Sequence, residues 1–244
     1  MAHAARRSWL DRILNLVGGN KKRPLASRPR LRPSLEALED RTLLAANITI
    51  VAGPAGTGNL DALLDATHGT ITTTDDPGDT AATVSTGALA GVGAGVAISI
   101  AAGNTIGFND ITSLNLQTGA GTSAAFSTGS VAITFANAAN TISTAGGSLS
   151  FDAGTNLNIA NLMTNGGDVS LSAGTGQIQV DSGASVQTGN GNVILRADAM
   201  TISGNVDAAN GIVTLTPETS GRASISALTR VRAIWALARV ISIK

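Results

Sequence analysis

A short pattern of aliphatic residues recurs about every twenty positions along the chain, and it restricts the fold more than any other feature. Four segments align: GGSLSFDAG (146–154), GGDVSLSAG (166–174), GNVILRADA (191–199) and GIVTLTPET (211–219). In these segments apolar residues recur at every second position, which is the period of a β-strand, although Ile194 adds an apolar residue between Val193 and Leu195. The alternation predicts a core ladder made of Leu149, Val169, Val193 and Val213, and, two positions later, Phe151, Leu171, Leu195 and Leu215. A repeat of this length predicts a stack of similar coils.

Two further apolar rows repeat with similar spacing and predict two more faces for each coil. One row is Leu157/Ile159, Ile178/Val180 and Met200/Ile202, and the other is Leu162, Val186 and Val206. Gly and Asn recur at the joints, where tight corners need positive φ. A single unit cannot bury its own apolar rows, but coils stacked about 4.8 Å apart pack them on one another. We therefore expect an all-β fold, a single-stranded, right-handed parallel β-helix of six to eight coils.

The composition fits a narrow core. Aromatic residues make up 2% of the chain and charged residues 13%, whereas Gly alone contributes 29 residues. Small and branched side chains fill a narrow tube, so we expect Phe108, Phe126, Phe135 and Phe151 to be core residues and not a binding platform. The absence of Cys excludes a disulfide scaffold, a zinc finger and a thiol nucleophile.

Charge divides the chain into unlike parts. Residues 1–41 carry a net charge of +6, residues 42–221 carry −11 and residues 222–244 carry +5. Together with the repeats, this division predicts four regions. They are a basic N-terminal arm (1–46), a cap on the solenoid (47–79), the β-helix repeats (80–225) and an atypical tail (226–244).

The basic arm is not expected to bind nucleic acid. Its Lys and Arg residues alternate with prolines, no aromatic stacking residue lies among them, and no known reader motif is present. Residues 80–108 carry no charge, but they are rich in Gly, and Val96, Ile98 and Ile100 alternate as in a strand. We therefore expect no membrane-spanning helix there.

The most specific motif is RLRPSLEALEDRTLLAA, residues 30–46. It resembles the N-terminal motif of large secreted and surface proteins of planctomycete bacteria, in which a basic run precedes Leu-Glu-x-Leu-Glu-x-Arg-x-Leu-Leu and small residues. The matching positions are Leu35, Glu36, Leu38, Glu39, Arg41, Leu43 and Leu44. The resemblance implies export to the cell surface or the exterior, with processing near Ala45 and Ala46.

Residues 47–65 have the outline of a phosphate-binding loop, because the pattern of a strand is followed by the glycine-rich segment GPAGTG and then by the pattern of a helix. The Lys and Ser/Thr that hold phosphate and Mg²⁺ are replaced by Asn59 and Leu60. We therefore expect no nucleotide cofactor. The segment is interpreted instead as a cap in which Leu60, Leu63 and Leu64 lie on a short helix and plug the first coil.

Three weaker polar candidates remain. The acidic loop 75–79 supplies oxygens suited to Ca²⁺ but lacks the alternating ligands of a calcium loop, so a solvated turn is favoured and calcium binding stays open. His68 could serve a hydrolytic site with an acid and a hydroxyl group. Asp152 and Asp198 occupy nearby repeat positions and could form a carboxylate pair. No catalytic residue, metal or cofactor is assigned.

The repeats over about 85–221 are similar to those of filamentous-haemagglutinin-type exoproteins, through GG-x-V-x-L-x-A-G and GN-V-x-x-x-N-G pieces. This resemblance implies a non-enzymatic, adhesin-like or structural stalk whose partners are surface glycans or other cell-envelope proteins. The alternative is a β-helix polysaccharide lyase or hydrolase. Two interpretations of the tail stay open, a capping helix or out-of-frame sequence that follows truncation within a much longer repeat protein.

Overall fold

The computed structural model describes residues 47–72, 75, 82–220, 224–226 and 230–232, and side chains only up to residue 220. All of them belong to one compact unit, which is described here by itself. The basic arm and its export motif, from Leu35 to Leu44, lie outside the described residues, as do residues 76–79 of the acidic loop.

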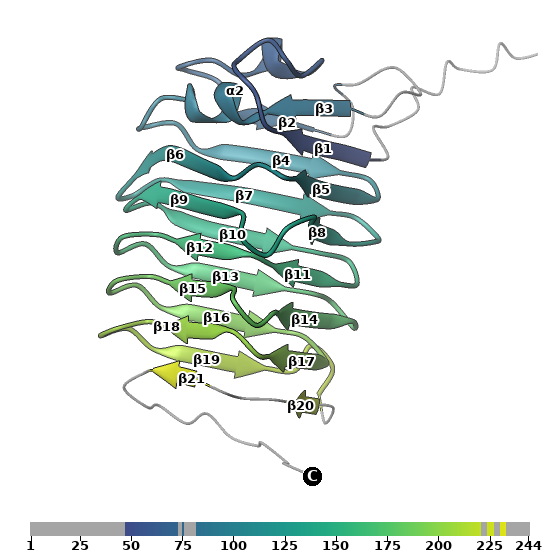
Figure 1. The fold of residues 1–244 in the computed structure, drawn as a ribbon, viewed down its shortest axis with the longest axis vertical. Helices are drawn as coiled ribbons and strands as arrows, with labels where there is room; N and C mark the ends of the chain where they lie inside the picture. Colours follow the sequence, from purple (N-terminus) through teal and green to yellow (C-terminus); the bar gives the residue numbers. More distant parts are fainter. Residues whose placement is uncertain (1–46, 73–74, 76–81, 221–223, 227–229, 233–244) are drawn as a thin grey trace, which may run out of the picture. The chain divides into compact units, whose positions relative to one another are not determined.

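Three parallel sheets make up the unit (Figure 1). Sheet A contains, in order, β20 (Ser224–Ser226), β17 (Ala199–Ile202), β14 (Gln177–Val180), β11 (Leu157–Ile159), β8 (Ile133–Phe135), β5 (Thr105–Asn109), β1 (Asn47–Val51) and β3 (Ala82–Ser85). Sheet B contains β19 (Val213–Thr216), β16 (Val193–Arg196), β13 (Val169–Ser172), β10 (Ser148–Asp152), β7 (Ser123–Thr128), β4 (Ile98–Ala102) and β2 (Thr70–Ile71). Sheet C contains β21 (Arg230–Arg232), β18 (Asn205–Asp207), β15 (Ser185–Gln187), β12 (Asn161–Met163), β9 (Thr141–Ala145) and β6 (Ser113–Gly119).

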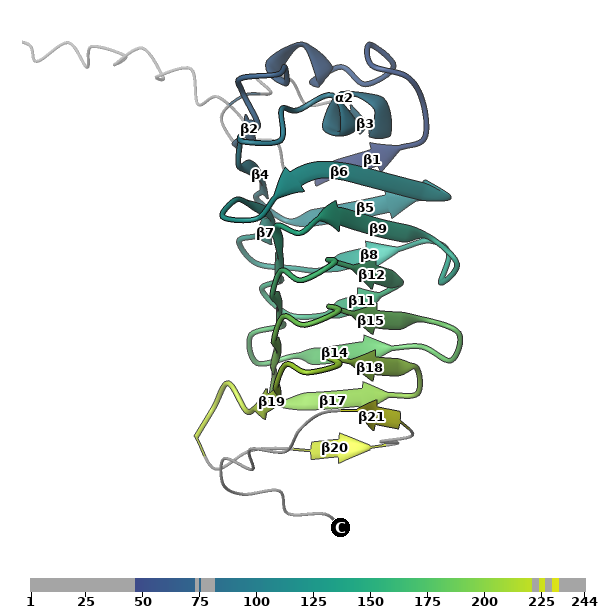
Figure 2. The same ribbon diagram turned by 90° about the vertical axis from the view of Figure 1, so that its left-hand side faces the viewer.

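From β4 onward the chain visits sheets B, A and C in turn, and each such circuit is one coil. Six coils are described between β4 and β21 (Figure 2). Each strand pairs in parallel with the equivalent strand of the next coil, as between β10 and β13 or between β13 and β16. The fold is therefore the expected all-β parallel β-helix.

The core ladder runs along sheet B in continuous register. Leu149, Val169, Val193 and Val213 are successive partners. Phe151, Leu171, Leu195 and Leu215 form the second row in the same three pairings. These side chains are buried except for Val213 and Leu215, which are half-buried because they belong to the last described strand of the sheet.

The same two rows continue into the earlier coils, although the sequence repeat is less regular there. Ile98, Ala124 and Leu149 are successive partners although they are 26 and 25 positions apart. Part of the extra length lies in β6, whose pairing with β9 shifts its register between Leu116 and Gly119. The register of sheet B is kept while the spacing in the sequence changes. The other two rows are also in register, with Leu157 beside Ile178 in sheet A and Leu162 beside Val186 in sheet C.

The four phenylalanines form one buried cluster, as expected. Phe108 and Phe135 stack in neighbouring coils with ring centroids 4.4 Å apart. Phe126 and Phe151 stack at 5.2 Å on the facing sheet. Edge-to-face contacts at 5.2 to 5.9 Å join the two stacks across the core. Aromatic packing of this kind adds to the burial energy of each ring.

Close approach between coils explains the glycines at one corner. A Cβ on Gly167 would lie 2.2 Å from the Gly147 carbonyl oxygen, and a Cβ on Gly191 would lie 2.2 Å from that of Gly167. Three residues before each corner glycine, the buried hydroxyls of Thr144, Thr164 and Thr188 donate to the carbonyl oxygens of Gly147, Gly167 and Gly191. The corner therefore needs both the missing side chain and the buried hydroxyl group.

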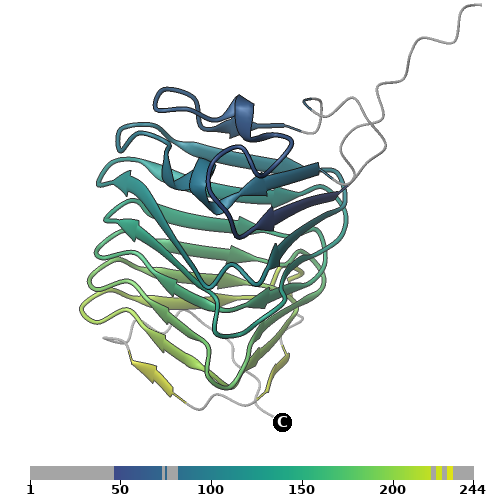
Figure 3. The same cartoon turned by 45° about the horizontal axis from the view of Figure 1, so that its top comes forward.

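The N-terminal end is irregular, and it includes more of the chain than residues 47–79 (Figure 3). β3 pairs with the outer side of β1, and α2 (Thr86–Ala90) contacts β6, so the regular coils begin at β4. The helix expected at Leu60, Leu63 and Leu64 is wrong, because only the 3₁₀ turn η1 (Asp61–Leu63) forms. Leu60 and Leu64 are buried, whereas Leu63 faces solvent at 39% exposure.

The uncharged stretch around residues 80–108 contributes β3, the short helix α2, the strand β4 and most of β5. Within the described residues, no helix has both the length and the apolar character required to cross a bilayer.

Candidate functional site

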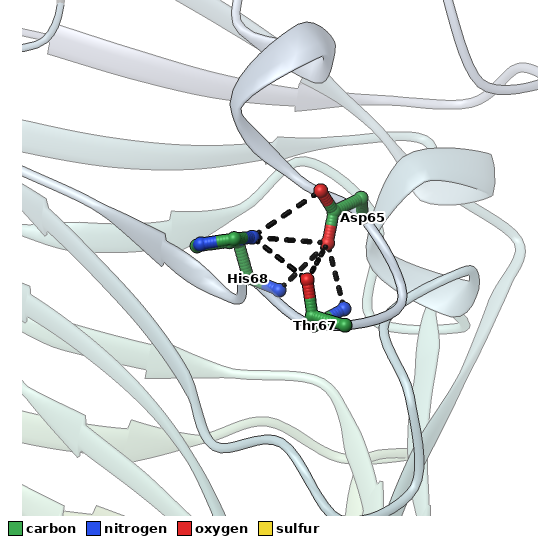
Figure 4. A network of polar contacts seen from close by, with 3 residues as sticks. All are labelled: Asp65, Thr67 and His68. Carbon is green, nitrogen blue, oxygen red and sulfur yellow. Dashed lines mark hydrogen bonds and ion pairs between the residues drawn. The ribbon is translucent and has the colours of Figure 1, made fainter.

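His68 lies in a compact polar turn with Asp65 and Thr67, just before β2 (Figure 4). The Asp65 Oδ1 atom accepts hydrogen bonds from two backbone N–H groups, that of Thr67 at 2.6 Å and that of His68 at 2.8 Å. It also accepts a hydrogen bond from the Thr67 hydroxyl group at 2.7 Å. Hydrogen bonds from the Thr67 hydroxyl and N–H, followed by those from His68, hold the pKa of Asp65 well below its usual range. The His68 Nδ1 atom lies 3.2 Å from Asp65 Oδ1 and 2.9 Å from the Thr67 hydroxyl oxygen.

This turn does not have the geometry of a hydrolytic relay. Such a relay needs the carboxylate at one ring nitrogen of the histidine and the nucleophilic hydroxyl at the other. Here Asp65 and Thr67 both contact Nδ1, and the second ring nitrogen points away from them (Figure 4). Both the His68 and the Asp65 side chains are also exposed, so the turn has no enclosed space for a substrate. The arrangement is a turn closed by its own side chains.

The glycine-rich loop holds a carboxylate of its own chain where a phosphate-binding loop would hold phosphate. Asp61 Oδ2 accepts the backbone N–H groups of Gly56 at 2.7 Å and Gly58 at 3.0 Å. It also accepts the Ser85 hydroxyl at 2.6 Å, while Oδ1 accepts the Ser85 N–H at 2.7 Å. Asp61 is buried, and it ties the loop to β3 and to the start of α2. The backbone N–H groups of Gly56 and Gly58 are thus already paired within the fold.

Ionisation of Asp61 is favoured by this environment. Burial opposes the charged form, but hydrogen bonds from the Ser85 hydroxyl, the Ser85 N–H and the N–H groups of Gly58 and Gly56 together lower the pKa below its ordinary value. Because the pKa is lower in the folded protein than in the unfolded chain, the ionised carboxylate stabilises the cap above the ordinary pKa of 3.8. This stabilisation is lost as the pH falls through the folded-state pKa.

Asp61→Asn is expected to lower the free energy of unfolding at pH 7 by about 1–3 kcal/mol, because three backbone N–H groups and a hydroxyl group lose a charged acceptor. Asp110→Asn, at an exposed position, is the matched control, with an expected change within about 0.5 kcal/mol. Urea unfolding at pH 7 and at pH 3 checks both values. The difference between wild type and Asp61→Asn should shrink at pH 3, and a difference that is equal or larger there would contradict this role.

Most carboxylates of the repeats are engaged in structural contacts. The register places Arg196, and not Asp198, in the column of Asp152, with Ser172 between them. Asp198 accepts the backbone N–H of Thr219 at 2.6 Å and its hydroxyl at 2.7 Å. The structure therefore does not place Asp152 and Asp198, which the sequence suggested as a carboxylate pair, in one column.

The remaining acids of the coils stabilise neighbouring strands and turns. Asp181 accepts the amide groups of Asn158 at 3.0 Å and Gln179 at 2.6 Å. Asp168 accepts the backbone N–H of Asn192 in the next coil at 2.7 Å. Over the described residues, no group of three or more His, Cys, Asp or Glu residues is placed to hold a metal ion. Asp75, the described part of the acidic loop, accepts the Thr72 N–H at 2.6 Å.

The outward faces of the sheets carry small polar side chains that bond from coil to coil. On sheet C, Ser143 donates to Asn115 at 2.5 Å and Ser185 donates to Asn161 at 3.0 Å. On sheet A, Gln177 donates to Thr201 at 2.7 Å. On sheet B, the outward positions from β4 to β13 are Ser or Ala apart from Asp152. Small side chains, most of them polar, therefore line the outward faces of all three sheets.

Sequence reasoning singled out His68 but not its two partners, and it overlooked Asp61. The pattern Asp-x-Thr-His is a signal for a side-chain-closed turn, because Asp and Thr commonly bond to nearby backbone groups. Asp61 follows a Gly-x-Gly loop by three residues, which is a weaker signal. Its second partner, Ser85, is 24 positions away and follows only from the fold.

Comparisons with protein-family models, with curated proteins and with solved structures found no match to this chain.

Proposed function

We propose that the coils form a structural or adhesin-like module of an exported protein that acts without enzymatic activity at the cell surface or outside the cell. The observation that carries this proposal is the continuity of the three sheets, in which each coil pairs with the next over strands of all three faces. Backbone pairing in every layer makes such a stack stiff along its axis. The likeness of residues 30–46 to a planctomycete export motif supports the location.

The outward faces suit contact with hydroxyl-rich partners such as surface glycans. Rows of Ser, Thr, Asn and Gln offer both donors and acceptors at the coil spacing of about 4.8 Å. Many weak polar contacts along a stiff surface add up when the partner is a long polymer. The proposed partners are therefore surface glycans or other components of the cell envelope.

The test of location uses the full-length chain with a C-terminal tag in the source cells. Protease applied to intact cells should remove the tag, and the tag should survive when Leu43 and Leu44 are both replaced by Asp. The matched control replaces Leu10 and Leu14, which lie outside the motif, by Asp. A cytosolic chain that intact cells protect from protease would contradict export.

The test of activity uses the purified protein with a panel of insoluble polysaccharides. Retention on one or more of them without release of soluble sugar is the expected result. Turnover that Asp152→Asn abolishes would contradict the proposal and favour a polysaccharide lyase or hydrolase.

A further inference from the structure

Three Asn-Gly steps lie at one corner of the coil, where the chain passes from sheet C to sheet B (Figure 1). They are Asn165–Gly166 before β13, Asn190–Gly191 before β16 and Asn210–Gly211 before β19. All three asparagines are exposed to solvent. An Asn-Gly step can lose ammonia spontaneously, because glycine has no side chain to keep its backbone nitrogen away from the amide carbon of the asparagine. The reaction needs an available glycine N–H, so the structure decides which step reacts.

The glycine nitrogen is engaged in two of the three steps. The Gly166 N–H donates to the Thr188 carbonyl oxygen at 2.5 Å. The Gly211 N–H donates to the Ala208 carbonyl oxygen at 2.7 Å. Among the described residues, the Gly191 N–H makes no well-formed hydrogen bond. A bonded N–H has to leave its acceptor before the nitrogen can attack, so Gly191 has the most available nitrogen of the three.

The side-chain amides of the three asparagines differ as well. The Asn190 Oδ1 atom accepts a hydrogen bond from the Asn210 Nδ2 atom at 2.9 Å. This donor stabilises the negative charge that develops on Oδ1 when a nucleophile adds to the amide carbon. In Asn165 the hydrogen bond lies on the other side of the amide, because Nδ2 donates to the Thr144 carbonyl oxygen at 3.1 Å. The step at Asn190 therefore combines an available nitrogen with an activated carbonyl group.

We propose that Asn190 is a site of spontaneous deamidation, activated by the Asn210 amide and with water as the co-reactant. The Gly191 nitrogen loses its proton to hydroxide and attacks Asn190 Cγ. The Cγ–Nδ2 bond then breaks, and Nδ2 takes a proton from water and leaves as ammonia, which closes a five-membered succinimide. Water opens this ring at the Cγ carbonyl group to give aspartate, or at the main-chain carbonyl group to give isoaspartate. One water is consumed, one ammonia is released, and no group is oxidised or reduced.

The isoaspartate product does not fit this corner. Its main chain is one atom longer, whereas Gly191 lies so close to the coil before it that a Cβ would be 2.2 Å from the Gly167 carbonyl oxygen. The Thr188 hydroxyl donates to the Gly191 carbonyl oxygen in the same turn, and the longer main chain would displace that contact. Deamidation would therefore loosen the contact between two coils and add a negative charge beside Asn210.

Peptide mass spectrometry of the full-length protein at pH 8 measures all three reactions in one sample. In the folded protein we expect Asn190 to convert about tenfold faster than Asn165 and Asn210, the factor for freeing one hydrogen-bonded N–H. The urea-unfolded chain is the control, in which the three rates should be similar because these contacts are lost. Gly191 is buried, so Asn190 should react more slowly in the folded protein than in urea.

Equal rates in the folded protein, or faster conversion of Asn165 or Asn210, would overturn the proposal. An Asn190 side chain that stays intact in the folded protein until the unfolded chain is fully converted would overturn it as well.

Asn210→Ala tests the contact at Asn190 Oδ1. Loss of this donor should slow the conversion of Asn190 about fivefold. Asn165→Gly is the matched control, because it removes an exposed asparagine side chain from the same corner of the neighbouring coil and glycine accepts the positive φ of 51° found there. This control should leave the rate at Asn190 unchanged. An unchanged or higher rate at Asn190 in Asn210→Ala would overturn the proposal.

Discussion

Phe151→Ala is expected to lower the free energy of unfolding by about 3–5 kcal/mol, the range for removing a buried aromatic ring. Phe151 is fully buried, and its ring centroid lies 5.2 Å from that of Phe126 and 5.9 Å from those of Phe108 and Phe135. Its removal would leave a cavity that touches both aromatic stacks. Neighbouring coils cannot collapse into this cavity without breaking the strand register, so little of the loss would be recovered.

The matched control for this variant is Ser150→Ala on the outward face of the same strand, with an expected change within about 0.5 kcal/mol. Urea unfolding followed by far-ultraviolet circular dichroism provides both values. A loss below about 1 kcal/mol for Phe151→Ala would mean that the aromatic cluster is not part of a packed core.

Gly191→Ala is expected to destabilise the stack by about 2–3 kcal/mol, because the new Cβ has no space at the corner. It would lie 2.2 Å from the carbonyl oxygen of Gly167 and 2.5 Å from the carbonyl carbon, so backbone would have to move in two coils. Gly95→Ala is the matched control, since a Cβ there meets no atom within 4 Å. Thermal unfolding of the two variants side by side gives the comparison. Equal melting temperatures would show that the coils are not in close contact at this corner.

The sequence predicted the repeats best where each coil keeps nearly the same length. Val169, Val193 and Val213 lie 20 to 24 positions apart, and the alternation around them fixes which side chains face inward. Ile98 and Ala124 belong to the same row, but they are 26 positions apart, with the long strand β6 between them, and small residues weaken the alternation. Only the hydrogen-bonded register shows that they are equivalent to Leu149.

The N-terminal end was harder to predict because it depends on contacts between distant residues. The placement of β3 outside β1 joins residues 34 positions apart, and local propensity does not encode it. Helical spacing is present at Leu60, Leu63 and Leu64. The hydrogen bond from the Ser85 N–H to Asp61 holds this segment against the end of β3, and only one 3₁₀ turn forms. The polar turn at His68 likewise shows that residue types alone did not reveal which ring nitrogen each partner contacts.

Cysteine cross-linking between coils tests the stacking most directly, because the chain has no cysteine of its own. Ser150 and Ser170 are register partners on the outward face of sheet B, and Thr214 lies in the same column two coils beyond Ser170. Strand spacing places Ser150 and Ser170 about 5 Å apart, within the reach of a disulfide, and Ser150 and Thr214 about 14 Å apart. Mild oxidation should therefore link the first pair within one molecule and leave the second pair as free thiols. Free thiols in the first pair, or equal cross-linking of both pairs, would contradict the stacked coils.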